Sequence, residues 1–201
     1  MEPKENLVGK KVAILATDGF EASELMKPRE ALLEAGADVQ IVAPHDGEIR
    51  SWKDKDWGDY VKVDRVLHDV KPDEYDALML PGGVINADRL RTENAAVQFV
   101  SEFVESGKPI AAICHAAWTL VETNKIHGRT LTSWPSLKTD IQNAGALWVD
   151  REVVTDNGLV TSRKPDDLPA FNRQMIEEFA EGIHRTPACS ESRDSLLNRM
   201  L

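Results

Sequence analysis

Cys114 and His115 follow directly after a short apolar run, and their side chains make this the first place to look for chemistry. The run, residues 109–113, lies just after Gly107 and is too short for a buried helix, so it predicts an internal β-strand. A segment whose sequence is compatible with a helix begins directly after this run. A strand that turns sharply into a helix holds a side chain above the sheet and directs helical N–H groups at it. These amides and the helix dipole would favour a thiolate at Cys114.

A nucleophilic thiol needs an acid or base within reach and donors for developing negative charge. His115 is a candidate base or orienting partner. Its N–H, with N–H groups around Gly82 and Gly83, could bind an oxyanion, since glycine permits close backbone approach. Two alternatives stay open: Cys114 could be an ordinary core residue among alanines, and Pro-Gly-Gly could be only a turn that ends a strand.

Glu21 and Glu24 lie three residues apart at the start of a predicted helix, so they share one face of it. That helix follows the first predicted strand, and one of the two carboxylates could therefore bind the Cys114 sulfur. The alternative is that both acids only complement the helix dipole.

Size and composition predict a single globular domain. The chain has 201 residues, 42% of them hydrophobic, and a formal net charge of −10 without a lysine or arginine cluster, which argues against nucleic acid or anionic membranes as partners. Its first residues are charged and no window resembles a membrane span, so we expect a cytoplasmic protein. Cys114 and Cys189 make no disulfide framework, as is typical of a reducing compartment.

The order of elements predicts an α/β fold with a doubly wound, mostly parallel sheet and helices on both faces. A strand over 11–16, a helix over 20–35 and a strand over 38–43 form a parallel crossover unit. A buried strand over 76–80 and a helix over 92–106 return the chain to the Cys114 strand. Because ligands bind at the carboxyl ends of such strands, we expect Glu21, Gly82 and Cys114 to converge there.

The remaining segments are peripheral. Residues 44–72 are irregular and polar, and we expect a small hairpin or an interface-forming excursion. A helix over 136–144 and a hairpin whose strands 152–155 and 159–162 flank an Asn-Gly turn come next. A last helix over 166–181 ends the domain at residue 182, and residues 183–201 read as a mobile tail.

The sequence predicts neither a metal nor a cofactor. It lacks a glycine-rich phosphate loop, and the histidines other than His115 show no metal-ligand spacing with one another. These four are His45, His68, His127 and His184.

Taken together, four motifs resemble the ThiJ/PfpI family, the cysteine-elbow branch of the class I glutamine amidotransferase-like superfamily. They cover residues 16–25, 76–83, 112–115 and 159–171, within a match over about 9–181. The resemblance implies a flavodoxin-like fold, a nucleophile at Cys114, a partner at His115 and a carboxylate from the 21–24 segment near the sulfur, with Glu24 as the first choice.

The family pattern also implies residues around the pocket. Asp88 matches an acidic residue that reaches the histidine of a neighbouring subunit, which would make the protein a homodimer or a higher homo-oligomer. Trp134 matches an aromatic pocket residue, and Trp118 is a further substrate-binding candidate. Ala116 and Ala117 stand where relatives usually have Gly-Pro; the elbow should survive, while pocket shape and substrate preference are expected to change.

The resemblance implies that one set of site residues could support several activities. These are deglycation of early adducts on amines, thiols or nucleotides, glutathione-independent conversion of methylglyoxal to lactate, and weak peptide hydrolysis. All of them fit a stress-protection hydrolase that binds a small reactive carbonyl. A thiol redox sensor or holdase chaperone without turnover is the alternative. A glutaminase is disfavoured because residues 161–167 contain no histidine.

Overall fold

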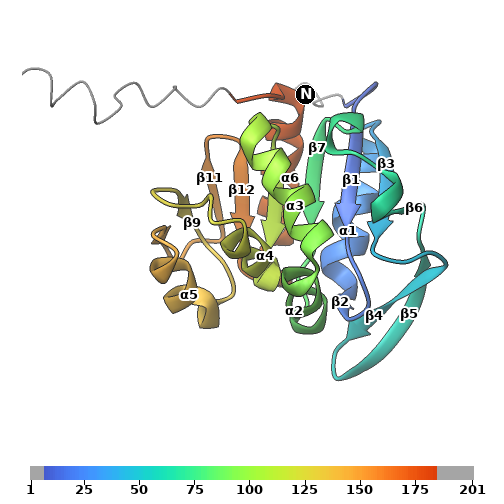
Figure 1. The fold of residues 1–201 in the computed structure, drawn as a ribbon, viewed down its shortest axis with the longest axis horizontal. Helices are drawn as coiled ribbons and strands as arrows, with labels where there is room; N and C mark the ends of the chain where they lie inside the picture. Colours follow the sequence, from blue (N-terminus) through green and yellow to red (C-terminus); the bar gives the residue numbers. More distant parts are fainter. Residues whose placement is uncertain (1–6, 185–201) are drawn as a thin grey trace, which may run out of the picture.

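The computed structural model describes residues 7–184, which form a three-layer α/β domain (Figure 1). A central seven-stranded sheet is covered by helices on both faces, and this confirms the predicted flavodoxin-like, doubly wound fold. All its strand pairs are parallel except the β11–β12 hairpin. In spatial order the strands are β11 (Val153–Asp156), β12 (Leu159–Ser162), β8 (Ile110–Ile113), β7 (Ala77–Leu80), β1 (Lys11–Leu15), β3 (Asp38–Ala43) and β6 (Arg65–Val66).

Strand side chains alternate between two hydrophobic cores, one on each face of the sheet. Helices α3, α4 and α5 pack on one face, while α1 and α6 pack on the other. Because both faces are covered, the central strands read as continuous apolar runs. The helices are α1 (Ala22–Glu34), α2 (Val84–Thr92), α3 (Asn94–Ser106), α4 (Ala117–Glu122), α5 (Lys138–Asn143) and α6 (Leu168–Glu181).

The 44–72 excursion contains the expected hairpin, formed by β4 (Glu48–Lys53) and β5 (Asp56–Lys62). It also pairs in parallel with the two-residue strand β2 (Phe20–Glu21), so helix α1 begins at Ala22 rather than at residue 20. The backbone of Arg50 bonds to Gly19 N–H and to the Asp18 carboxylate. The excursion therefore fixes the turn that leads into α1 (Figure 1).

Two other boundaries differ from the sequence prediction. Residues 84–92, for which no helix is predicted, form α2 directly after the Pro-Gly-Gly turn. At the other end, His184 donates its N–H to the Gly107 carbonyl over 2.8 Å, so it is held against the domain although it was expected in a mobile tail. The rest of that tail, residues 185–201, lies outside the described residues.

A short parallel pair, β9 (Thr130–Leu131) with β10 (Leu147–Trp148), completes the fold. Within residues 7–184 no helix is long and apolar enough to span a membrane.

Candidate active site

Cys114 lies at the sharp turn between β8 and α4, as the sequence predicts. Its φ is +63°, a conformation that non-glycine residues rarely adopt. A single 3₁₀ turn, Cys114–Ala116, joins the strand to the helix. Only 7% of the residue is exposed. Strained backbone of this kind persists only where the surrounding structure holds it, and it is common at functional sites.

Glu24 is the carboxylic acid beside the sulfur. It is fully buried in the first turn of α1, whereas Glu21 caps that helix: the Glu21 Oε2 accepts the Glu24 N–H at 2.8 Å and the Ser23 hydroxyl at 2.6 Å. From the residues alone either acid could bind the sulfur, and the family resemblance made Glu24 the first choice. The structure places Glu24 at the thiol and gives Glu21 a capping position.

Burial raises the pKa of Glu24 from 4.5 to about 8, and the negative charge of Glu21 adds to the rise. Neither Glu24 oxygen makes a well-aligned hydrogen bond within residues 7–184. The Cys114 side chain and the Gly82 N–H nevertheless lie close enough to lower that pKa in part. Glu24 is therefore largely a neutral acid at pH 7 and can both donate and accept a proton.

The thiol itself does not match the expectation of a charged sulfur at neutral pH. Burial raises the pKa of Cys114, and the charge of an ionised Glu24 raises it further. The N–H groups of His115 and Gly83 oppose this rise. The sequence suggested the amides and a nearby carboxyl group, but it did not reveal how strongly burial disfavours an unpaired thiolate.

His115 completes the contacts of the sulfur. Its Nδ1 lies 3.2 Å from the Cys114 Sγ, and burial lowers the pKa of the imidazole to about 4, so it is neutral at pH 7. Trp134 stacks on the ring at 5.8 Å between centroids, and Trp118 meets its edge at 5.2 Å. The Trp118 indole N–H is in turn held by Asp140. Both predicted tryptophans thus contact the histidine ring, and Trp134 is 39% exposed.

Gly82 occupies a position where there is no room for a side chain. A Cβ at this position would lie 2.3 Å from the Glu24 Oε2 and 2.7 Å from the Cys114 Cβ, so any side chain would separate the acid from the thiol. Its N–H faces Glu24, whereas the N–H of Gly83 faces the sulfur. Of the predicted oxyanion donors, the N–H groups of Gly83 and His115 therefore face the Cys114 sulfur, and that of Gly82 faces Glu24.

Asn86 is a site residue that the sequence analysis missed. It is completely buried on α2; its Oδ1 accepts the Thr17 N–H at 2.8 Å, and its Nδ2 donates to the carbonyls of Pro81 and Gly82. These bonds join the β1 turn to the Pro-Gly-Gly turn and fix the orientation of the peptide groups there. A polar residue one turn into a helix after Pro-Gly-Gly was the available signal, but α2 itself was not predicted.

Comparison with known proteins agrees with this geometry. The model of the DJ-1/PfpI family matches residues 10–178. The chain belongs to this family. Protein/nucleic acid deglycase 2 of Escherichia coli is 44% identical over 170 residues, which cover 84% of this chain and 97% of that protein. General stress protein 18 of Bacillus subtilis is 41% identical, with 84% and 97% covered. The crystal structure of Drosophila melanogaster DJ-1beta has a TM-score of 0.77 at 29% identity and covers 85% of this chain and 90% of its own.

Asp88, which the DJ-1/PfpI resemblance assigns to a neighbouring subunit's histidine, is exposed on α2. Among the described residues its carboxylate makes no hydrogen bond or ion pair. Val84, one turn earlier on the same helix, is 53% exposed. The position of Asp88 outside its own site is compatible with a role across an interface, which stays a prediction.

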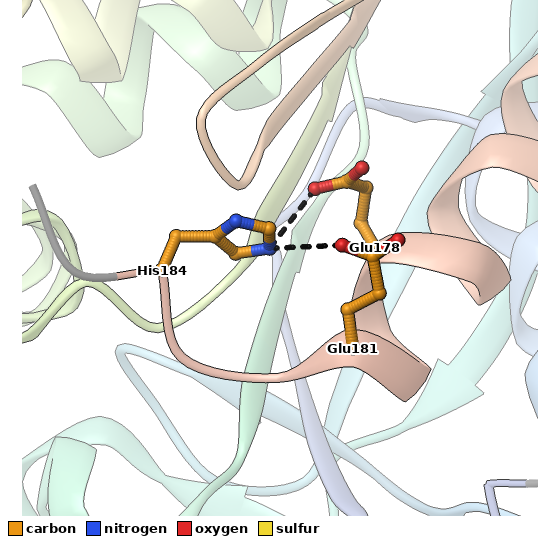
Figure 2. Close-up of side chains that lie close together, drawn as sticks. All are labelled: Glu178, Glu181 and His184. Atoms are coloured by element: carbon orange, nitrogen blue, oxygen red, sulfur yellow. Dashed lines mark ion pairs between the residues drawn. The ribbon is translucent and has the colours of Figure 1, made fainter.

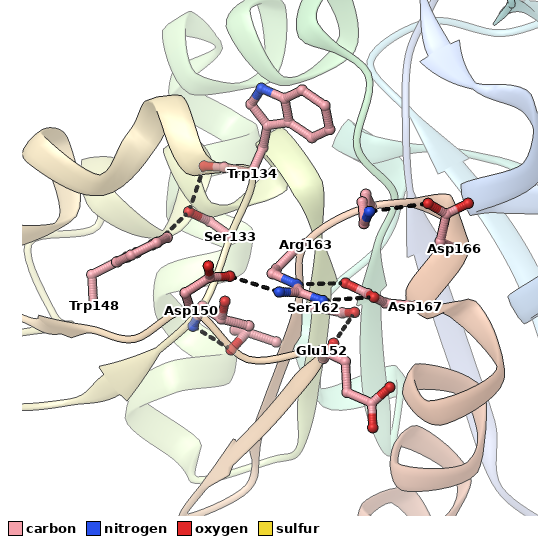
Figure 3. Close-up of polar contacts among 12 residues, drawn as sticks. Ser133, Trp134, Trp148, Asp150, Glu152, Ser162, Arg163, Asp166 and Asp167 are labelled. Atoms are coloured by element: carbon pink, nitrogen blue, oxygen red, sulfur yellow. Dashed lines mark hydrogen bonds and ion pairs between the residues drawn. The ribbon is translucent and has the colours of Figure 1, made fainter.

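The last DJ-1/PfpI motif forms a polar network beside the elbow (Figure 3). Arg163 follows Ser162, which pairs with Ile113 just before the cysteine. Its guanidinium binds Asp167 through two bonds, at 2.8 and 3.0 Å, and Asp150 at 2.6 Å. Two carboxylates thus neutralise this arginine, and the network fixes the end of β12 next to the active site.

Proposed function

We propose that this DJ-1/PfpI protein is a cysteine-dependent enzyme that acts on reactive-carbonyl adducts, as a deglycase of proteins or nucleotides or as a glutathione-independent glyoxalase. The observation that carries the proposal is the convergence of a strained cysteine, a buried carboxylic acid and two amide donors on one sulfur. The names of two relatives, a protein/nucleic acid deglycase and a general stress protein, support it.

In this mechanism the Cys114 sulfur adds to the carbonyl carbon of the substrate. The new S–C bond uses a sulfur electron pair, the C=O π pair moves to oxygen, and the thiol proton passes through Glu24 or His115 to that oxygen, giving a hemithioacetal. The N–H groups of Gly83 and His115 stabilise the oxyanion as it forms. For methylglyoxal the overall reaction adds one water to give lactate, with the aldehyde carbon oxidised and the ketone carbon reduced.

The burial of Cys114 favours small electrophiles over a peptide backbone. With only 7% of the residue exposed, an aldehyde reaches the sulfur more readily than an extended chain does. Peptide hydrolysis is thus the lesser activity in this proposal. A glutaminase is disfavoured because the segment after β12 holds Arg163, paired with two aspartates, and no histidine. We place the activity in the cytoplasm, since a reactive thiol persists in a reducing compartment.

A redox sensor or holdase is the second candidate, favoured by the same amides and acid around Cys114, which would also stabilise an oxidised sulfur. In that case the thiol is oxidised and no carbonyl substrate turns over.

The test compares the parent protein with Cys114→Ser and, as the matched control, Cys189→Ser. Lactate production from methylglyoxal and release of amine from a methylglyoxal-treated N-acetyl-lysine are measured. We expect Cys114→Ser to lose at least about 100-fold in rate, while Cys189→Ser keeps the parent rate. Parent-like turnover in Cys114→Ser would refute the proposal. Rapid peroxide oxidation at Cys114, seen by intact mass, without turnover of any dicarbonyl would favour the sensor.

A further inference from the structure

Three ligand-type side chains meet at the C-terminal end of α6 (Figure 2). Glu178 and Glu181 lie in its last turn, and His184 follows after the chain turns at Gly182. The His184 Nε2 is 3.1 Å from Glu178 Oε2 and 3.8 Å from Glu181 Oε2. One ligand atom from each residue fits within 4.8 Å of the others.

Two of these atoms are buried without a hydrogen-bond partner. Glu178 is only 6% exposed, and within residues 7–184 neither its Oε2 nor the His184 Nε2 makes a hydrogen bond, although they face each other at 3.1 Å. A buried carboxylate oxygen left in this state is costly unless another group binds it. The two atoms form an ion pair but no hydrogen bond, and a ligand bound to both would satisfy them.

We propose that Glu178, Glu181 and His184 bind a divalent first-row metal ion, with Zn²⁺ as the best match. Metal–oxygen and metal–nitrogen bonds of about 2.0–2.2 Å place adjacent ligand atoms roughly 3–3.5 Å apart. The 3.1 Å pair already has this separation, and the exposed Glu181 side chain needs only a small movement. An imidazole with two carboxylates suits a borderline metal rather than Ca²⁺ or Mg²⁺, which prefer oxygen ligands alone.

The surrounding backbone holds this site in place. His184 N–H bonds to the Gly107 carbonyl at 2.8 Å, and Gly182 N–H bonds to the Glu178 carbonyl at 3.1 Å. Gly158, in the β11–β12 turn, lies so close that a Cβ there would be 2.7 Å from the His184 Cδ2. The metal would therefore fasten the end of α6 to the segment entering β8 and to the hairpin turn.

The site is separate from the proposed catalytic centre. Gly107 precedes β8 and Cys114 follows it, so the whole strand, four extended residues or about 13 Å long, lies between them. A metal here acts as a structural clamp and takes no part in the chemistry of the thiol. The spacing of the histidines among themselves does not reveal this site, because it combines one histidine with two glutamates.

The test is calorimetric titration of Zn²⁺ into full-length protein carrying Cys114→Ser and Cys189→Ser, so that neither thiol competes. We compare added Glu178→Gln, Glu181→Gln and His184→Gln substitutions, with Glu177→Gln as the matched control on the same helix. Glu177 bonds to Gln174 and is not part of the cluster. Glu181 is 58% exposed at its side chain, so Glu181→Gln should fold even if Glu178→Gln does not.

We expect one Zn²⁺ per chain, at least tenfold weaker binding in each of the three site variants, and unchanged binding in Glu177→Gln. Zn²⁺ at about 100 times its Kd should raise Tm by roughly 5–10 °C in the parent and not in His184→Gln. No heat of binding in the parent, or binding as tight as the parent's in His184→Gln and Glu181→Gln, would overturn the proposal and leave a simple ion pair.

Discussion

Glu24 and Cys114 behave as one titrating unit, because each lies in the field of the other. With the pKa of Glu24 raised to about 8 and that of Cys114 raised further, the pair holds both protons over most of the neutral range. Loss of the first proton gives a single charge shared between sulfur and carboxyl group, stabilised by the N–H groups of Gly82, Gly83 and His115. We infer that this singly ionised pair is the reactive form.

The pH dependence of stability tests the buried acid. Between 4.5, its value in an unfolded chain, and about 8, folded Glu24 keeps a proton that the unfolded chain has lost. Its contribution to stability is therefore complete below pH 4.5 and is lost as pH rises through 8. We compare the parent with Glu24→Gln by chemical denaturation at pH 5 and pH 8. Between these pH values the free energy of unfolding of the parent should fall by about 1–4 kcal/mol more than that of Glu24→Gln.

Glu30→Gln is the control for that experiment, because its side chain is exposed on the same helix as Glu24. It should follow the parent across the same pH range. A parent whose dependence on pH is unchanged by Glu24→Gln would show that Glu24 is ionised in the fold.

At the level of elements, the proposed active site is assembled from three turns that end neighbouring strands. The turn after β1 supplies Glu24, the turn after β7 supplies the Gly83 amide, and the turn after β8 supplies Cys114. The β4–β5 hairpin fixes the first turn through Arg50, and α2 fixes the second through Asn86. A substitution at Arg50 or Asn86 should therefore shift atoms of the proposed site that the substituted residue does not contact.

Asn86→Ala is the sharpest test of this positioning. It leaves the Thr17 N–H without an acceptor and removes the side-chain bonds to the Pro81 and Gly82 carbonyls, so we expect a loss of about 2–4 kcal/mol in stability. Displacement of the Gly83 amide should lower kcat more than it raises KM, because that amide acts on the developing oxyanion. Asn172→Ala, which removes one weak surface contact, is the control. Unchanged kcat in a folded Asn86→Ala protein would contradict the positioning role.

At the level of the whole molecule, the outer face of α2 carries Val84 and Asp88 away from their own site. An exposed valine beside a carboxylate that has no partner among residues 7–184 is a suitable surface for a second copy of the chain. In a two-fold assembly each Asp88 would approach the histidine of its partner, and both sites would be shared.

Mixing two inactive variants tests that arrangement. Cys114→Ser and Asp88→Ala chains, unfolded and refolded together in equal amounts, would form hybrids in which one site has both native residues, restoring up to about a quarter of the parent rate. Activity is measured with methylglyoxal, and molecular mass by light scattering. If the mixture shows only the sum of the separate variants, or if the protein is a monomer, Asp88 does not act across an interface.

Much of this molecule was determined locally by its sequence. The apolar runs and the turn residues between them predicted the parallel sheet, the Asn-Gly hairpin and the strand that leads to Cys114, because period and turn chemistry are short-range properties. The sequence also indicated that Glu21, Glu24, Gly82 and Cys114 would meet at one edge. It did not predict α2, whose mixed polar sequence gave no strong helical pattern.

Only the tertiary structure decided which of these residues does what. Burial assigns Glu24 to the thiol and Glu21 to the helix cap, raises the pKa of Cys114, and makes Asn86 a buried link between two turns. It also brings His184 back onto Glu178 through the bend at Gly182. Desolvation and contacts between distant segments set these properties, and the spacing of residues along the chain predicts neither of them.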